Sequence, residues 1–529
     1  MKRAWPVLIP VATLSALVAA VPALGAAPAG PAAATTCLGK PVTIVASQAV
    51  TTGTEGDDVV AMTPGAWTSF DALGGNDTIC LASGAATGGR DPRAPYGAAD
   101  AGPGDDVVVY SPGQRATGIM EVGLGAGNDT FVGTGAPTML ERVYADSSTE
   151  MYSYAETPPP GDHRDVIDMG GAAPQNKGAS ESYRDSVWSV APRDAANADR
   201  ITFGKGRAYL YYRGAMAPEG SLDVTAATQT TLHLPEPGAA EPVARGELLV
   251  DAVARRASVA GRQVLAWQGR VDTYQFADEE TWDLPVSFLG SDADETLRFD
   301  QGTYGDVRLG GGDDWLEAAE YSSSDGVMFR SADGGPGNDT ALLVHNCSRL
   351  DIRLAARVTC DDSSAAYSGF ESAPVTNYKA GGHVTLVGTR ADEYLTAVAD
   401  RVTIHAGGGA DDIAVWAQRV RVNAGSGADT VEADGQDVIV RGQAGADRIS
   451  LSQPRDKVPG KRPVLRRWVA LGGPGRDVLT GTSQVKHADR LIGGPGRDRA
   501  DGDGGARDYC DAEVTRRCER GPARGSDRR

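Results

Sequence analysis

The sequence predicts an all-β fold, a parallel β-solenoid built from coils of about 18 residues with Gly- and Asp-rich turns. A short phrase recurs along the chain: small residue, Gly, any residue, Gly, any residue, Asp, any residue, apolar residue. Its spacing is most regular between Val384 and Ile449, where the acidic sixth position recurs every 18 residues, at Glu393, Asp411, Asp429 and Asp447. A strict period of this length is typical of stacked coils.

Each 18-residue unit also contains two short strand signals. An apolar residue follows the acidic position by two, and an apolar pair with i, i+2 spacing precedes each phrase, as in Val402 and Ile404. Side chains at i and i+2 of a strand point the same way, so these residues can stack inward while each strand pairs with its equivalent in the next coil. The alternative, Gly-rich turns between antiparallel strands, is disfavoured by four consecutive units in register.

The composition agrees with turns that hold a cation. The chain has 68 Gly among 529 residues, and 70 acidic against 51 basic residues leave a formal charge of −19. Glycine permits left-handed backbone and close approach of neighbouring coils. Stacking would place the sixth-position carboxylates in a row, where they repel one another unless a cation lies between them. Carboxylate and carbonyl oxygens are hard ligands that suit Ca²⁺, whereas so acidic a chain is a poor nucleic-acid binder.

The phrase resembles the nonapeptide repeat GGxGxDxUx of the RTX (repeats-in-toxin) family, as in Gly334–Ala341 and Gly472–Leu479. The resemblance implies a β-roll in which Asp carboxylates and loop carbonyls of adjacent coils share several Ca²⁺ ions. The stretch from Cys37 to Cys80 and the ending Gly504–Cys518 resemble actinobacterial members of the family. The resemblance gives a ligand role to Asp58, Asp77, Asp106, Asp129, Asp314, Asp339, Asp411, Asp429, Asp447, Asp477 and Asp498.

The repeats depart from the family in their spacing. The family repeats every nine residues, with a calcium turn at both ends of each coil, whereas the spacing here is mostly 17 to 25 residues with one Gly-rich turn per coil. We therefore expect one row of ions rather than two, and fewer filled sites than motifs. The isolated motif at Asp129 is a candidate for a simple turn, and Glu295 and Glu393 look like the first units of their arrays.

The N-terminus and the cysteines indicate export. Residues 1–25 are predicted to be a signal peptide, because Lys2 and Arg3 are followed by an apolar run and small residues, so we expect a secreted chain with no membrane span in its mature form. An even number of cysteines in such a chain suggests disulfides. Among the 15 possible connectivities we favour the local one, Cys37 with Cys80, Cys347 with Cys360 and Cys510 with Cys518.

After the signal peptide the repeats divide the chain into four parts: N-terminal repeats at 26–135, a motif-poor β region at 136–289, the main array at 290–512 and a basic tail at 513–529. The region 136–289 is either a continuation of the solenoid, which we favour, or a separate β domain. An insertion with six basic residues, Gln453–Arg467, is either a solvated loop or a contact for an acidic polymer.

No constellation for catalysis is found in the sequence. None of the six His residues lies in an HExxH motif, and no GxSxG motif occurs. We therefore expect a non-catalytic, monomeric calcium-binding protein, coupled in its folding to calcium, whose candidate partner is a cell-surface or extracellular polymer. Two alternatives stay open: a carbohydrate-active enzyme of the lyase or epimerase type that uses residues 136–289, and a surface adhesin with calcium-stabilised repeats.

Overall fold

The structure is a computed structural model that describes residues 36–46, 50–63, 68–82, 96–110, 118–134, 139–147, 164–170, 184–191, 196–234, 246–276, 285–299, 304–319, 329–452, 467–483, 488–504 and 507–521. In these ranges all the regular secondary structure is β-strand, from β1 to β45. Most neighbouring strands pair in parallel, coil upon coil, so the predicted all-β parallel solenoid is confirmed. Nothing in the described part of the chain forms a helix that could cross a membrane.

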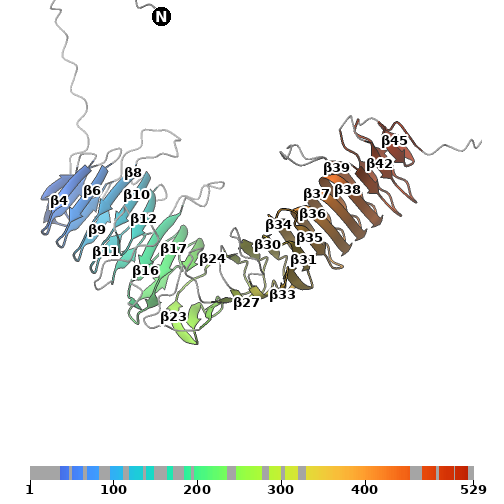
Figure 1. The fold of residues 1–529 in the computed structure, drawn as a ribbon. Coiled ribbons are helices and arrows are strands. Elements are labelled where there is room, and N and C mark those ends of the chain that lie inside the picture. The colour runs from blue at the N-terminus through green and yellow to red at the C-terminus, as the bar shows by residue number, and fades with distance from the viewer. Residues whose placement is uncertain are drawn as a thin grey trace, which may run out of the picture.

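The N-terminal arm is built from two columns of parallel strands, each column one face of the solenoid (Figure 1). Successive coils contribute one strand to each column. The first column contains β4 (Val50–Thr54), β6 (Thr68–Leu73), β8 (Tyr96–Asp100), β10 (Gly118–Gly123), β12 (Met139–Tyr144), β14 (Asp185–Val190), β17 (Arg207–Arg213) and β20 (Gln229–Leu234). The second contains β3 (Ile44–Ala46), β5 (Val59–Met62), β7 (Thr78–Leu81), β9 (Val107–Tyr110), β11 (Thr130–Val132), β13 (Val166–Asp168), β16 (Arg200–Thr202) and β19 (Ser221–Asp223).

The C-terminal arm also has two columns, which merge into 15-residue strands in its most regular coils. The first column continues from β20 through β24 (Thr273–Phe276), β26 (Thr296–Phe299), β28 (Trp315–Ala319), β30 (Thr340–His345), β34 (Ser372–Asn377), β36 (Tyr394–Gly408), β37 (Asp412–Ser426), β38 (Thr430–Ala444), β39 (Arg448–Ser452), β41 (Val478–Thr480), β43 (Arg499–Asp501) and β45 (Val514–Arg516). The other contains β21 (Leu248–Asp251), β25 (Val286–Leu289), β27 (Tyr304–Arg308), β29 (Phe329–Asp333), β33 (Ser363–Ser368), β31 (Arg349–Arg353), β35 (His383–Val387), the second halves of β36 to β38, β40 (Arg467–Leu471), β42 (Asp489–Ile492) and β44 (Tyr509–Asp511).

The two arms meet at an angle near β23 (Arg262–Ala266) and β27 (Figure 1). Here β24 pairs in parallel with β20, so the first column runs through both arms. In the N-terminal arm the Gly-rich turns follow the strands of this column, whereas in the C-terminal arm they precede them. The turns therefore change from one edge of this sheet to the other at the junction.

The motif-poor region between 136 and 289 belongs to the same stack where the structure describes it, because β12, β14, β17, β20 and β24 pair in sequence. Two antiparallel excursions interrupt the second face: β22 (Arg256–Val259) with β23 next to β21, and β32 (Ala356–Cys360) between β33 and β31. The short pairs β1 (Thr36–Cys37) with β2 (Lys40–Pro41) and β15 (Ala196–Asn197) with β18 (Ala215–Met216) complete the strands.

The interior of the solenoid is a continuous stack of apolar side chains. Ile413, Val431 and Ile449, the apolar eighth positions, are fully buried, as are Val420 and Val438 of the facing strand segments. The structure contains three disulfides, Cys37–Cys80, Cys347–Cys360 and Cys510–Cys518, which are the local pairs that the sequence favours. The predicted signal peptide at 1–25, the insertion at 453–466 and the last tail residues, 522–529, lie outside the described residues.

Candidate calcium ladders

The sixth-position carboxylates form ladders along the solenoid. In each ladder one carboxylate oxygen accepts the backbone N–H of the acidic residue in the preceding coil. Asp429 Oδ1 accepts from Asp411 N at 3.0 Å, Asp447 Oδ1 from Asp429 N at 3.1 Å, and Asp477 Oδ1 from Asp447 N at 2.9 Å. The stacking that the 18-residue period predicts therefore brings consecutive carboxylates into direct register.

Three ladders of this kind follow one another along the chain. The N-terminal ladder contains Asp58, Asp77, Asp106, Asp129, Asp165 and Asp199. The middle ladder contains Glu295, Asp314, Asp339 and Glu371. The C-terminal ladder contains Glu393, Asp411, Asp429, Asp447, Asp477, Asp498 and Glu513. All eleven predicted ligand residues lie in these ladders, including Asp129, which is a rung rather than an isolated turn.

Sequence reasoning missed several rungs. Asp165 lies in a degraded copy of the phrase and Asp199 lies in a stretch without glycine, so only the stacking reveals them. A fourth, short ladder contains Asp489, Asp508 and Glu519 and precedes β42 and β44, at the other edge of the coils that carry Asp477 and Asp498. Carboxylates therefore line both corners of the last coils, whereas the sequence predicted one Gly-rich turn per coil; the single row of ions stays a prediction.

The second oxygen of most rungs has no hydrogen-bond partner although it is buried. This applies to Oδ2 of Asp77, Asp106, Asp129, Asp165, Asp314, Asp339, Asp411, Asp429, Asp447, Asp477, Asp498 and Asp508. A buried, unsatisfied carboxylate oxygen is unfavourable by several kcal/mol unless a cation or a proton compensates it. The same unsatisfied oxygen in successive coils indicates a ligand row rather than a local packing error.

The first rung of a ladder closes its own turn instead. Asp58 Oδ2 accepts from the N–H and the hydroxyl of Thr54, at 2.8 and 2.9 Å. Glu295 and Glu393 are bonded in the same way to a Ser and a Thr four residues earlier, Ser291 and Thr389. The donors Thr54, Ser291 and Thr389 occupy the position, four residues before the carboxylate, that is commonly Gly in later rungs. This agrees with the prediction that Glu295 and Glu393 start their arrays.

Steric contact between coils explains this exchange of Thr or Ser for Gly. A Cβ added to Gly425 would lie 2.1 Å from the carbonyl oxygen of Gly407 in the preceding coil, and one added to Gly427 would lie 1.7 Å from that of Gly409. Both glycines have positive φ, 124° and 140°. A coil with no preceding turn against it avoids this clash, so its second position tolerates a side chain.

The fifth position forms an outer, exposed ladder in the opposite direction. Asp105 Oδ1 accepts from Asn128 N at 3.0 Å, and Asp313 Oδ1 accepts from Asn338 N, also at 3.0 Å. Here the carboxylate of one coil accepts from the next coil, whereas a sixth-position carboxylate accepts from the preceding one. Consecutive turns are thus held by hydrogen bonds in both directions.

The inner ladders are electrostatically unfavourable as bare carboxylates. The pKa of Asp106 is raised to about 7 and that of Asp129 to about 8. Burial is the main cause and the charges of neighbouring rungs add to it, while a backbone hydrogen bond opposes both. Burial, then the charges of Glu393 and Asp429, raise the pKa of Asp411 to about 7. Near neutral pH these rungs therefore favour a bound cation or a proton.

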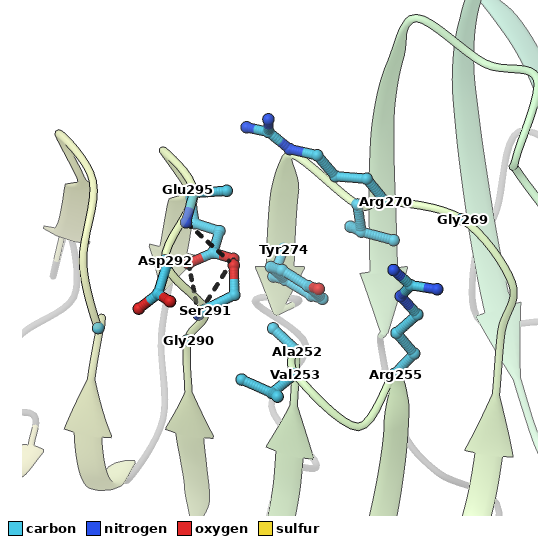
Figure 2. A pocket seen from close by; sticks show the side chains of 13 residues that line it. Ala252, Val253, Arg255, Gly269, Arg270, Tyr274, Gly290, Ser291, Asp292 and Glu295 are labelled. Atoms are coloured by element: carbon cyan, nitrogen blue, oxygen red, sulfur yellow. Dashed lines mark hydrogen bonds between the residues drawn. The ribbon is translucent and has the colours of Figure 1, made fainter.

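The middle ladder begins beside a cavity of about 400 Å³ at the junction of the arms. Figure 2 shows Glu295 and Ser291 on one side of Tyr274 and Arg255 on the other, while Arg270 passes above Tyr274 toward Glu295. The Arg270 Nε lies 3.0 Å from the Asp272 carboxylate, and its Nη2 donates to the Asp294 carbonyl at 2.7 Å. Positive side chains therefore lie at the end of the ladder that no preceding rung covers.

The donor set fits calcium. The inner ladders offer carboxylate oxygens, already buried and partly without partners, within turns lined by backbone carbonyls. Ca²⁺ binds six to eight such hard oxygen ligands, and the cysteines of the chain are all in disulfides. The rungs with a free Oδ2 are the residues that would hold the ions, which would supply positive charge between the stacked carboxylates.

Comparison with known proteins identifies the turns. The family model of the RTX calcium-binding nonapeptide repeat (4 copies) matches residues 387–418, 423–453 and 486–506. The chain therefore carries RTX-type calcium-binding repeats in these segments, as the recurring phrase indicated. The match includes rungs Glu393 to Asp447 of the C-terminal ladder. No curated protein and no solved structure matches the chain significantly.

Proposed function

We propose that this protein is a secreted, non-catalytic scaffold whose coils are joined by calcium ions and whose folding is completed by calcium outside the cell. The observation that carries the proposal is the row of buried carboxylate oxygens without hydrogen-bond partners. The disulfides support an extracellular location, since disulfides persist in oxidising compartments. Several ions are expected, each shared between consecutive rungs.

Coupling between calcium and folding follows from the electrostatics. The unfolded chain keeps its carboxylates apart in water, whereas the solenoid brings them together and buries them. Without a cation, the folded state bears both the desolvation and the mutual repulsion of the rungs. An ion that binds only the stacked rungs adds its binding free energy to the stability of the fold.

Circular dichroism in chelator and then in millimolar Ca²⁺ tests the proposal. We expect a gain of strand signal on adding calcium and a smaller gain with Mg²⁺ at equal ionic strength, because Mg²⁺ dehydrates reluctantly and demands octahedral geometry. Calorimetric titration of the same sample gives the number of ions. Identical spectra with chelator and with calcium would contradict the proposal.

One feature favours a second, partner-binding role for the motif-poor region and the adjoining strand β26. Arg184, Arg207 and Arg298 line a pocket of about 170 Å³, and the Arg184 guanidinium lies 3.8 Å from the centre of the Tyr209 ring. Clustered guanidinium groups recognise carboxylates, so an acidic extracellular polymer is the proposed partner. Retention on immobilised polyuronate should fall in Arg207→Ala, and the same polymer incubated with the protein would reveal depolymerisation if the enzyme alternative holds.

A further inference from the structure

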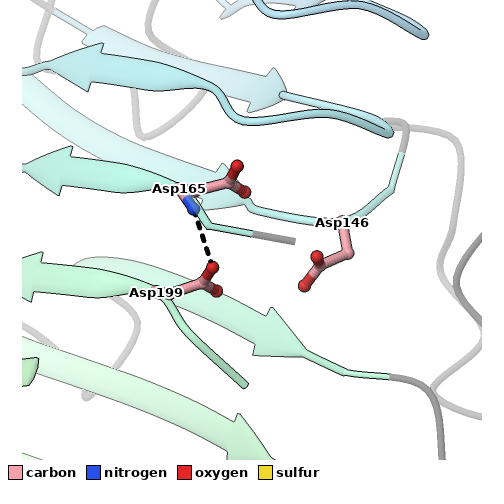
Figure 3. A group of neighbouring side chains, drawn as sticks. All are labelled: Asp146, Asp165 and Asp199. Carbon is pink, nitrogen blue, oxygen red and sulfur yellow. Dashed lines mark hydrogen bonds between the residues drawn. The ribbon is translucent and has the colours of Figure 1, made fainter. Parts of the chain in front are cut away.

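Three buried carboxylates converge in the motif-poor part of the N-terminal arm (Figure 3). Asp146 follows β12, Asp165 precedes β13 and Asp199 precedes β16. Each offers one oxygen, and these three oxygens lie within 4.8 Å of one another. Their residues are 2 %, 1 % and 1 % exposed. The cluster lies outside the segments that match the RTX repeat.

The contacts of the cluster hold one side of the carboxylates in place. Asp199 Oδ1 accepts from Asp165 N at 2.9 Å, and its Oδ2 accepts from the Ser189 hydroxyl at 2.6 Å. Asp146 Oδ2 accepts from Val190 N at 3.0 Å. Backbone and hydroxyl donors therefore fix the orientation of two of the carboxylates, as expected for preorganised ligands.

Two buried oxygens at this place have no hydrogen-bond partner. One is Asp165 Oδ2. The other is the hydroxyl of Tyr212, a residue that is 2 % exposed and extends from β17. Burial, followed by the charges of Asp199 and Asp146, raises the pKa of this tyrosine, so its hydroxyl lies within the field of the cluster. Buried polar atoms normally have partners, and the carboxylate oxygen of Asp165 is of the type that Ca²⁺ binds.

We propose that Asp146, Asp165 and Asp199 form a discrete calcium site of a type different from the Gly-rich turns. Opposed ligands of one ion lie about 4.8 Å apart at a Ca–O distance of about 2.4 Å, which the three oxygens satisfy. The third carboxylate, Asp146, belongs to the first strand column, whereas Asp165 and Asp199 are rungs next to the second. An ion here therefore joins the two faces of the solenoid as well as two consecutive coils.

This site differs from an ordinary rung in its local backbone. No glycine lies within five residues before Asp199, and Asp165 follows a phrase with a single glycine, Gly161. In this site the third carboxylate, Asp146, supplies the ligand oxygen that backbone carbonyls supply in the Gly-rich turns. The proposal is independent of calcium binding at the Gly-rich turns.

The test compares Asp146→Asn with a matched control, Asp168→Asn, in the full mature chain. Asp168 is exposed and lies outside the cluster. Calorimetric titration with Ca²⁺ should show one ion fewer in Asp146→Asn and the wild-type number in Asp168→Asn. In chelator the melting temperature of Asp146→Asn should equal or exceed that of the wild type, because the variant removes one of three adjacent negative charges. Adding calcium should raise the melting temperature of Asp146→Asn by less than it raises that of the wild type.

Each other outcome has a defined meaning. A wild-type calcium number in Asp146→Asn overturns this site and leaves the Gly-rich turns untouched. A lower melting temperature in chelator with an unchanged calcium number shows that the cluster is a structural hydrogen-bond network and also overturns it. If Asp146→Asn does not fold, Tyr212→Phe replaces it with terbium as the probe: loss of a tyrosine-sensitised emission component supports the site, and unchanged emission overturns it.

Discussion

The strongest test of the ladders is a pair of substitutions at one rung, Asp429→Asn and Asp429→Ala. The carboxylate of Asp429 has two separable roles: its Oδ1 accepts the buried N–H of Asp411, and its Oδ2 is buried without a hydrogen-bond partner. Asparagine keeps an acceptor for the N–H and removes the charge, whereas alanine removes both. The two variants therefore separate the hydrogen bond from the ligand.

The expected magnitudes differ with calcium. In chelator, Asp429→Ala leaves the Asp411 N–H buried without an acceptor, which destabilises by about 1–3 kcal/mol. Asp429→Asn is expected to be neutral or slightly stabilising there, because the Asp429 charge raises the pKa values of both Asp411 and Asp447. In calcium both variants should lose stability relative to wild type, since the rung contacts the preceding and following coils.

Urea unfolding in chelator and in millimolar Ca²⁺, together with calorimetric titration, measures these effects. Asp412→Asn is the matched control, because Asp412 directly follows Asp411, the rung of the preceding coil, and is exposed. The calcium number should fall by as many as two ions in both Asp429 variants and stay at the wild-type value in the control. A calcium number and midpoint in Asp429→Asn equal to those of Asp412→Asn would refute shared ligation by the rungs.

Three further predictions follow from the same geometry. Because burial raises the pKa of Asp106 from 3.8 to about 7 and that of Asp129 from 3.8 to about 8, the calcium-free folded state binds more protons than the unfolded chain. The melting temperature in chelator should therefore fall from pH 5 to pH 8, and a rise over that window would contradict the burial of ionised rungs. Gly427→Ala should lower the free energy of unfolding in urea by about 2 kcal/mol or more, because its Cβ would lie 1.7 Å from the carbonyl oxygen of Gly409 in the preceding coil. The control Gly381→Ala, also at positive φ but with nothing within 4 Å of its Cβ, should lose only about 1 kcal/mol, and equal losses would show that contact between coils is unimportant. Replacing both cysteines of the Cys347–Cys360 disulfide by serine should lower stability by about 3 kcal/mol, and non-reducing peptide mapping of the wild type should recover this pair; cross-linking to any other cysteine would contradict the pairing.

Much of the main array was predictable from sequence because its register is local. The acidic and apolar positions of Glu393 to Ile449 repeat every 18 residues, and equal coil lengths leave one way to stack equivalent strands. The hydrogen bonds between Asp411, Asp429 and Asp447 follow from that register. Where coil length varies, as between Asp129 and Asp199, the period fades and the rungs could not be predicted.

The sequence by itself determined the kind of protein: a stacked β-solenoid with calcium-binding turns, since glycine and carboxylate at fixed offsets encode both the turn and its ligand. Only the tertiary structure decided where the rungs continue without glycine, that both corners of the last coils carry carboxylates, and that Asp146 joins Asp165 and Asp199. The physical reason is that these contacts join different strand columns or coils of unequal length. Whether these carboxylates come together depends on how the whole stack of coils packs, and a local sequence period does not encode that packing.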